Sequence, residues 1–156
     1  MDIPNYELRK INDNLSNIFL KNKKIKISLN NVLLPFGLES YDYFSEKKYF
    51  IQAELPENDI IFFKNLEFNI SDKLNIEKSF INTQIITNSK FNDKLKINIH
   101  QKKDKILTDF IDCNHKLITM FDIKKNQKYD LVMSPIVFHN HEKIILKWSL
   151  IKMKCV

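Results

Sequence analysis

The segment SPIVFHNHEKIILKWSLIKMKCV (134–156) carries the pattern that decides the fold of this chain. On both sides of HNHE (139–142), apolar residues alternate with other residues, which is typical of two β-strands joined by a tight turn. Leu146 and Trp148 share one face of the second strand, and the apolar phase then shifts by one position, as a β-bulge would produce. We therefore expect a β-hairpin in which Asn140 supplies the positive φ of the turn.

The same alternation recurs through most of the chain and predicts further short strands. The expected strands are residues 23–29, 48–55, 80–87, 94–100, 117–124, 128–138 and 143–155. Helical spacing is found in two segments, 5–20 and 56–74, and the second begins with Pro56 and an acidic first turn. Gly37 is the only glycine, so the turns must be built from Asn, Asp and Lys.

These elements predict a mainly β fold. Short strands that can pair antiparallel, with one inserted helix and a possible N-terminal helix, fit a small OB-like antiparallel barrel, closed or half-closed. A two-layer sandwich fits the same pattern. No linker, repeat or low-complexity block interrupts the chain. We expect residues 1–21 to form an N-terminal helix or arm and residues 22–156 to form one OB-like domain.

Lysine dominates the charge of the sequence, which has a formal net charge of +6. A positive balance favours a polyanionic partner, although many ordinary soluble proteins reach the same value. Arg9 is the only arginine, and the wealth of Lys, Asn, Ile and Phe indicates an AT-rich coding sequence. Arginine is the usual reader of guanine edges, whereas lysine contacts phosphate as a point charge. If the partner is a nucleic acid, the composition favours sequence-independent binding over base readout.

Two features of the sequence concern its compartment. Cys113 and Cys155 are the only cysteines, which is too few for a disulfide framework, so we expect both to be reduced thiols. The N-terminal MDIPNYELRK lacks the apolar core of a signal peptide, and no run approaches the ~20 apolar residues of a membrane span. We therefore expect a soluble intracellular protein without a membrane partner.

Cysteine and histidine form two pairs at i, i+2 spacing, Cys113 with His115 and His139 with His141. Residues at i and i+2 share a strand face, so the pairs are candidate zinc ligands or unrelated turn residues. Neither pair is a CxxC, and a nuclease of the HNH type needs its three ligands on separate elements. Catalytic motifs such as G-x-S-x-G are absent, and one glycine cannot build a P-loop. We expect no catalysis, metal or cofactor.

Basic strand faces interleaved with aromatic residues form the third pattern. Phe50 lies on the polar side of its strand, and Tyr41, Tyr43 and Phe44 crowd a segment expected to be a loop. Lysines that follow phosphates and aromatic rings that stack bases hold single-stranded nucleic acid in this way. The same pattern also fits solvated lysines and core phenylalanines. The candidate binding residues from these arguments are Lys24, Lys26, Tyr43, Phe50, Lys94, Lys96, Lys102, Lys103 and Lys147.

The order of short motifs resembles one protein family. The matching segments are NVLLPFGLESY (31–41), KYFIQAEL (48–55), FFKNLEFNISDKL (62–74), TDFIDCNHKLITMFDIKKNQKYDLVMSPIVF (108–138) and KIILKWSLIKMKCV (143–156). With them the chain resembles the single-stranded-DNA-binding proteins of large eukaryotic DNA viruses, which are themselves similar to short phage single-stranded-DNA-binding proteins. The sequence departs from that family at its end, where KMKCV (152–156) stands in place of the acidic tail that relatives often carry.

The resemblance implies an OB-fold barrel that coats single-stranded DNA in viral replication and recombination, without catalysis or cofactor. It adds Phe138 and Trp148 to the candidate binding residues, although Trp148 also fits the core. It implies action in the host cytoplasm or a viral replication compartment, with single-stranded DNA as ligand and replication proteins as possible partners. RNA is an alternative ligand, because stacking and phosphate contacts barely distinguish it from DNA. The oligomeric state stays open, and a homodimer is possible. The alternative is a small structural or assembly subunit that binds protein: a virion component, or an accessory subunit of a replication or transcription complex.

Overall fold

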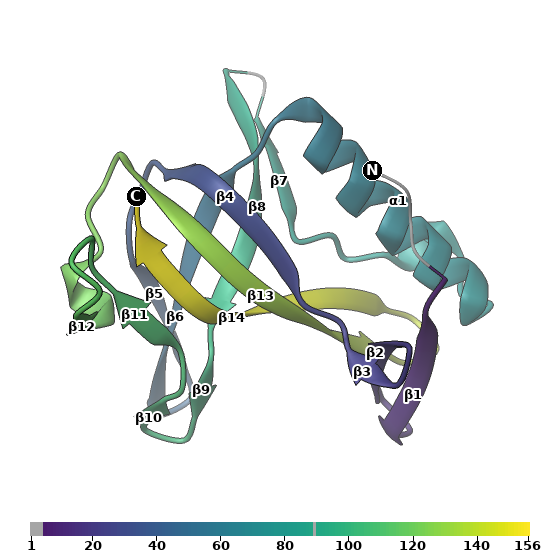
Figure 1. Ribbon diagram of the computed structural model, residues 1–156. Helices are drawn as coiled ribbons and strands as arrows, with labels where there is room; N and C mark the ends of the chain where they lie inside the picture. Colours follow the sequence, from purple (N-terminus) through teal and green to yellow (C-terminus); the bar gives the residue numbers. More distant parts are fainter. Residues whose placement is uncertain (1–4, 89) are drawn as a thin grey trace. The chain divides into compact units, whose positions relative to one another are not determined.

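The computed structural model describes residues 5–88 and 90–156, whose elements Figure 1 labels. One α-helix, α1 (Glu57–Lys73), and two 3-10 helices, η1 (Lys78–Phe80) and η2 (Met120–Asp122), accompany the strands. The strands are β1 (Glu7–Asn12), β2 (Leu15–Leu20), β3 (Lys23–Lys24), β4 (Ile27–Leu34), β5 (Glu39–Tyr43), β6 (Glu46–Glu54), β7 (Ile85–Asn88), β8 (Phe91–Ile99), β9 (Gln101–Lys102), β10 (Lys105–Ile106), β11 (Asp109–Ile111), β12 (Leu117–Ile118), β13 (Gln127–His139) and β14 (Ile144–Cys155). Within the described residues, no helix is long and apolar enough to span a bilayer.

Five of these strands close on themselves by hydrogen bonding. The order is β13-β4-β6-β8-β14, and β14 pairs again with β13. The pairs β4–β6 and β4–β13 are antiparallel, whereas β8 and β14 are parallel. Figure 1 shows β4 and β13 lying side by side. The chain is therefore an OB-like closed barrel, with α1 inserted between β6 and β8, as the alternation of apolar residues predicted.

Two compact units divide the contacts of the chain. The first unit comprises residues up to Ile25, Leu55–Leu95 and Pro135–Lys147, and the second comprises Lys26–Glu54, Lys96–Ser134 and Trp148–Val156. Each has its own buried apolar side chains. Those of the first unit include Ile18, Phe63, Ile70, Leu95 and Leu146, and those of the second include Leu34, Ile51, Ile97, Leu131, Met133, Trp148 and Leu150. The expected boundary between residues 21 and 22 stays a prediction.

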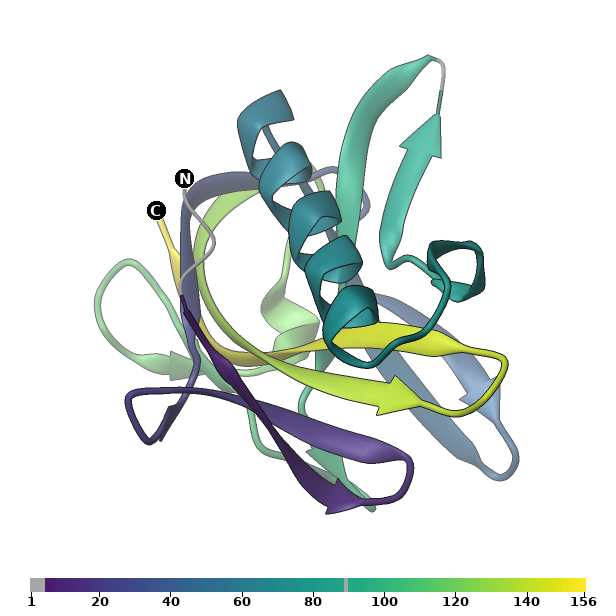
Figure 2. The same cartoon turned by 90° about the vertical axis from the view of Figure 1, so that its right-hand side faces the viewer.

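The predicted N-terminal helix over residues 5–20 is wrong, because this segment is a β-hairpin. Figure 2 shows β1 and β2 as the purple hairpin. Leu8 pairs with Ile18 across the two strands. The apolar residues that suggested one face of a helix are therefore brought together by strand pairing. The turn uses Asn12, whose Oδ1 accepts a hydrogen bond from the Asn14 N–H at 2.8 Å. Pairing of β2 with β13 then favours the extended backbone.

Helix α1 confirms the prediction for residues 56–74. Pro56 stands at the N-cap, and Glu57 and Asp59 complement the positive end of the helix dipole. One face is buried, with Ile60, Phe63, Leu66 and Ile70 in the apolar interior of the first unit. The helix ends in a Schellman motif: Asn75 has φ +54°, and the N–H groups of Asn75 and Ile76 donate to the carbonyls of Asp72 and Ser71.

The closing hairpin is present, although its turn differs from the prediction. β13 continues to His139, and the Asn140 N–H donates to the Lys143 carbonyl at 2.9 Å. Asn140 does not have a positive φ; its Oδ1 instead accepts the Glu142 N–H at 2.9 Å, an Asx turn.

The buried phase of β14 shifts after Leu150, as the sequence indicated. The next fully buried residue is Met153, three positions later. At the same place β14 changes its parallel neighbour from β8, which pairs up to Leu150, to β11, which pairs from Lys152. The shift therefore coincides with the change of partner strand.

Four other expected boundaries are corrected. Only Ile85–Asn88 of the expected strand 80–87 is a strand, and Phe80 belongs to η1. Similarly, residues 117–124 contain the short β12 followed by η2, in which Thr119 and Asp122 form a capping box. The segment with Tyr41 and Tyr43, expected to be a loop, is strand β5. Finally, Lys24 ends β3 whereas Lys26 precedes β4, so the two lysines do not share a strand.

Residues other than glycine build most of the turns, as the composition required. Among the described residues, eight non-glycine residues have positive φ: Lys21, Asn22, Asn31, Phe44, Asn75, Lys103, His115 and Asn126. Gly37, with φ +64°, lies between β4 and β5, where a Cβ would stand 3.3 Å from the Lys125 backbone nitrogen. Glycine is therefore favoured there both by backbone conformation and by the close approach of Lys125.

Candidate nucleic-acid interface

The outer faces of β6 and β8 carry the candidate site. On β6, Ile51 and Ala53 are fully buried, so the intervening Phe50 and Gln52 point outward. On β8, Ile97 is fully buried and the preceding residue, Lys96, lies on the opposite face. β6 and β8 are neighbours in the sheet and are the second and third strands of the barrel. In OB-folds this is the face that binds oligonucleotides and oligosaccharides.

Tyr41, Phe50 and Lys96 form one contact cluster on that face, which we call the aromatic–lysine cluster. The Lys96 Nζ lies 4.7 Å from the ring centroid of Phe50 and 4.9 Å from that of Tyr41. The two ring centroids are 5.9 Å apart, with the rings tilted by 55°. Tyr41 is 41% exposed, so one of the rings is accessible to a ligand.

Strand pairing explains why these three side chains meet. Phe50 pairs directly with Glu39 across β5 and β6, and Tyr41 is the diagonal neighbour two residues further along β5. A polar contact flanks the cluster, since the Gln52 Nε2 donates to Glu39 Oε2 at 2.8 Å. This hydrogen bond engages one carboxylate oxygen of Glu39, the residue that pairs with Phe50 across the two strands.

Gln101 fixes the neighbouring part of β6. Its Oε1 accepts the Tyr49 N–H at 3.1 Å, and its Nε2 donates to the Lys47 carbonyl at 3.2 Å. The Tyr49 ring packs edge-on against Phe121, with centroids 5.9 Å apart. Hydrogen bonds to Gln101 therefore hold the backbone of β6, and an aromatic contact holds its Tyr49 ring. Both restrict the strand that carries the outward side chains.

The tip of the β5–β6 hairpin presents two more aromatic rings. Tyr43 is 55% exposed and Phe44 is 89% exposed, and their rings meet edge-to-face at 4.7 Å between centroids. Phe44 has φ +56°, which is uncommon for a bulky residue. The hairpin thus holds an exposed aromatic pair in a strained turn, in the same β4–β6 connection that carries Tyr41.

The other predicted site residues lie outside this cluster. Lys24, Lys26, Lys102, Lys103 and Lys147 are exposed. Lys102 and Lys103 form the β9–β10 turn, where Lys103 has φ +56°. Phe138 is half-buried on β13, where it pairs with Leu15 of β2. These placements leave the lysines open to solvent, and their role in binding stays a prediction.

Two predicted residues are placed where a nucleic acid cannot reach their functional groups. Trp148 is 1% exposed and belongs to the core of the second unit, so its indole offers no face for a base. Lys94 is 5% exposed, and its Nζ donates to the Asn92 carbonyl at 2.8 Å. Strand alternation predicted an outward Lys94, but the side chain is buried. Trp148 therefore takes the core alternative that the sequence left open, and the ammonium of Lys94 is engaged within β8.

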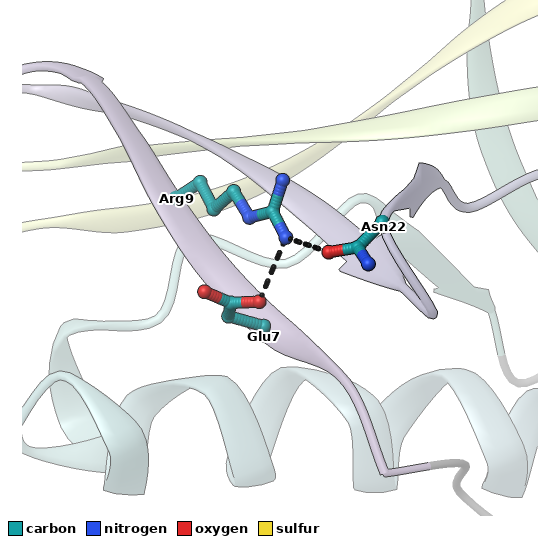
Figure 3. A network of polar contacts seen from close by, with 3 residues as sticks. All are labelled: Glu7, Arg9 and Asn22. Atoms are coloured by element: carbon teal, nitrogen blue, oxygen red, sulfur yellow. Dashed lines mark hydrogen bonds and ion pairs between the residues drawn. The ribbon is translucent and has the colours of Figure 1, made fainter.

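Figure 3 shows the only arginine engaged within the N-terminal hairpin. The Arg9 Nη2 donates to Asn22 Oδ1 at 2.7 Å and contacts Glu7 Oε2 at 3.1 Å, and its guanidinium lies 4.2 Å from the centroid of the Phe19 ring. These contacts connect β1, the end of β2 and the turn that follows. The side chain best suited to reading guanine is therefore occupied in the fold.

The histidine and cysteine pairs do not assemble a metal site in the part of the chain that is described. No group of three or more His, Cys, Asp or Glu side chains there could hold a metal ion. His139 is 8% exposed, and its Nε2 shares a hydrogen bond with Ser16 Oγ at 3.1 Å. Desolvation, and secondarily the charge of Lys10, lowers the pKa of His139, which keeps it neutral near pH 7.

Sequence reasoning found Phe50 and Lys96 but assigned Tyr41 to a loop and left Gln52 and Glu39 unmentioned. The signal that was missed lies at the two-residue turn Phe44–Ser45. The segments ESYDY (39–43) and EKKYF (46–50) flank this turn and pair with each other. Pairing outward from that turn places Glu39 opposite Phe50 and Tyr41 beside it. No glycine marks the turn, because Phe44 occupies the positive-φ position.

Solved structures of one phage protein share this fold over nearly the whole chain. The single-stranded DNA-binding protein from bacteriophage Enc34 in complex with ssDNA has a TM-score of 0.59 and 12% sequence identity, covering 97% of this chain and 94% of that one. A second structure of the protein has a TM-score of 0.57 at 13% identity, covering 97% and 89%. A C-terminal truncation has a TM-score of 0.57 at 12% identity, covering 96% and 94%.

At these identities the similarity establishes the fold. The predicted resemblance to phage single-stranded-DNA-binding proteins is therefore confirmed at the level of the fold. Membership in the family from large eukaryotic DNA viruses stays a prediction. No family model matches the sequence, and no curated protein matches it either.

Proposed function

We propose that this protein binds single-stranded DNA, without reading its sequence, on the outer face of β6 and β8. The observation that carries the proposal is the aromatic–lysine cluster, in which the Lys96 Nζ lies within 5 Å of two aromatic ring centroids. A base that stacks on such a ring contributes roughly 1–3 kcal/mol, and the adjacent ammonium can contact the phosphate that follows. Tyr43 and Phe44 extend the aromatic surface along the same hairpin.

The charged residues of the chain favour contact with the phosphate backbone of DNA over recognition of its bases. Arg9 is bound within its own hairpin, and the remaining cations that could reach a phosphate in the described chain are lysines. Lysine contacts phosphate without the bidentate geometry that distinguishes guanine. The exposed Lys102 and Lys103 turn adds positive charge in the second unit.

In this proposal the protein acts in viral DNA replication and recombination, without catalysis or cofactor. It coats exposed single strands in the host cytoplasm or a viral replication compartment. The support is the shared fold with a phage protein whose structure was solved in complex with ssDNA, together with the motif order of the sequence.

Fluorescence anisotropy of a labelled oligo-dT at several salt concentrations tests the proposal. With roughly five phosphates contacted, log K should fall with log[salt] at a slope of about −3.5. Because Trp148 is buried, a label on the DNA is a better reporter than the intrinsic tryptophan. Absence of binding at low salt, or equal affinity for duplex, would overturn the proposal. Oligo-U in parallel measures whether RNA competes, since stacking and phosphate contacts distinguish the two poorly.

The charge reversal Lys96→Glu separates DNA binding from the alternative role as a protein-binding subunit. The DNA-binding proposal requires it to weaken oligo-dT binding at least tenfold with the fold intact. Lys116→Glu, at an exposed residue beyond β11, makes the same charge change outside the cluster and serves as the matched control. Equal DNA affinity for both variants, with loss of a co-purifying protein only in Lys96→Glu, would favour the subunit role.

A further inference from the structure

The two cysteines of the chain meet at the end of the second unit. β11 pairs in parallel with β14, and the register reaches Ile111 opposite Lys154. Cys113 follows β11 by two residues, and Cys155 is the last residue of β14. The strand pairing therefore brings together two thiols that are far apart in the sequence.

A contact of the Cys113 sulfur places this side chain beside the end of β14. The Cys113 Sγ lies 3.9 Å from the carbonyl oxygen of Val156, the residue after Cys155. The neighbouring Cys113 thiol and, secondarily, burial raise the pKa of Cys155. Cys113 is exposed and Cys155 is partly exposed, so both sulfurs can be reached from solvent.

The turn after β11 is braced by Asp112. Its Oδ1 accepts hydrogen bonds from the N–H groups of Asn114 and Lys116, at 2.8 and 2.9 Å, and its carbonyl accepts the His115 N–H at 3.1 Å. His115 has φ +62°, which completes the tight turn. Cys113 lies inside this braced turn, so its position beside the end of β14 is fixed by backbone contacts.

We propose that Cys113 and Cys155 are a redox pair that closes a reversible disulfide when the protein meets a low-molecular-weight disulfide such as oxidised glutathione. The exposed Cys113 thiolate attacks one sulfur of glutathione disulfide, which releases one glutathione thiolate and leaves a mixed disulfide on Cys113. The Cys155 thiol loses its proton to solvent and attacks the Cys113 sulfur. The second glutathione then leaves as a thiolate. Glutathione disulfide is reduced to two glutathione molecules, and the two protein thiols are oxidised to one disulfide.

The bond would link the turn after β11 to the last strand. It would close a loop of roughly 40 residues, which contains β12, η2, β13 and β14. Because a cross-link restricts the unfolded chain more than the folded one, the oxidised protein should melt at a higher temperature, by on the order of 5–10 °C. A reducing compartment keeps the pair as thiols, which agrees with the expectation of reduced cysteines there.

The experiment treats the whole chain with oxidised glutathione and measures its intact mass, thiol content and melting temperature. The expected product has lost two hydrogen atoms, carries no glutathione, has no titratable thiol and melts higher; dithiothreitol should reverse each change. Cys113→Ser and Cys155→Ser are the controls. Each leaves one thiol, so each should gain the mass of one glutathione without a rise in melting temperature.

Three results would overturn the proposal. The first is a wild-type chain that keeps glutathione on one or both cysteines, and the second is a covalent dimer on a non-reducing gel. The third is an internal disulfide that lowers the melting temperature, since it would show that the thiols must leave their native positions to react. Circular dichroism of the serine variants establishes that their behaviour is not due to unfolding.

Discussion

β8 carries two lysine–aromatic pairs that sequence alternation makes equivalent and the structure makes different. Lys94 is 5% exposed, donates to a backbone carbonyl at 2.8 Å, and lies 5.5 Å from the ring centroid of Phe91. Lys96, two residues later, is half-buried and lies over two rings of the β5–β6 hairpin. The first lysine serves the fold of the first unit, whereas the second belongs to an outward surface of the second unit.

The difference shows what decides whether a strand lysine can bind a ligand. Alternation says only which face of the strand a side chain takes. The surroundings of the side chain decide the rest: Lys94 is buried and donates to a carbonyl, and Lys96 contacts aromatic rings that are themselves partly exposed. The following variants test that distinction, beginning with the largest effect.

Charge reversal at the two positions should separate stability from binding most strongly. Lys94→Glu places a carboxylate where the buried ammonium met a carbonyl, and should lower the free energy of unfolding by about 2–4 kcal/mol. Lys96→Glu should cost less than about 1 kcal/mol because its side chain is more exposed. Urea denaturation followed by circular dichroism measures both. An equal loss of unfolding free energy in the two variants would contradict the assignment of Lys94 to the fold and of Lys96 to the outward surface.

The two phenylalanines give the second comparison. Phe50→Ala should weaken oligo-dT binding by about 1–3 kcal/mol, roughly 5- to 150-fold, because it removes one ring of the aromatic–lysine cluster. Phe91→Ala, at a residue that is 66% exposed at the start of β8, is the matched control and should change affinity less than twofold. Anisotropy titration at one salt concentration measures both. A larger loss in Phe91→Ala would move the binding face to the other end of β8.

Neutralising each lysine should alter the salt dependence differently. Lys96→Gln should make the slope of log K against log[salt] less negative by about 0.7, which is one phosphate contact on a single strand. Lys94→Gln should leave the slope unchanged, because its Nζ is occupied by the Asn92 carbonyl. Thermal melts of both variants are needed first to establish that they are folded at the assay temperature.

The first unit also buries a carboxyl group, which gives the smallest effect. Desolvation raises the pKa of Glu67 despite a 2.8 Å hydrogen bond from Thr83 Oγ1. A raised pKa means that the folded state holds the proton more tightly, so stability is lost as the pH rises above the unfolded pKa and the carboxyl ionises. Glu67→Gln should therefore stabilise the protein near pH 7 by up to roughly 1 kcal/mol and have little effect near pH 4. Chemical denaturation at the two pH values measures this, and an equal effect at both would contradict it.

Elements set by local pattern could be predicted from the sequence. Alternation located β6, β8, β13 and β14, and Pro56 with an apolar stripe located α1. The N-terminal hairpin could not be predicted in this way, because Leu8 and Ile18 fit both helical spacing and a strand pair. The pairing of β2 with β13, more than a hundred residues away in sequence, stabilises the strand and has no local signature.

The candidate site was only partly accessible to sequence reasoning for the same reason. Phe50 and Lys96 could be assigned to outward faces, but their contact with each other depends on which strands are neighbours in the barrel. For Trp148 the sequence left core and stacking open, and for Lys94 alternation predicted an outward face; the burial of both side chains has no signature in that alternation. Periodicity reports the face of a strand and not what lies on that face.

The scarcity of glycine links the base composition of the coding sequence to the heat resistance of the protein. Asparagine and lysine codons are rich in A, glycine codons are rich in G, and this chain places asparagine at turns such as Asn75, where glycine is the usual residue. A left-handed conformation costs asparagine least among the residues other than glycine, and costs residues such as Lys21 roughly 1 kcal/mol or more. Protein engineering for thermal tolerance would therefore begin at turns such as that of Lys21, where glycine would relieve backbone strain without disturbing the barrel.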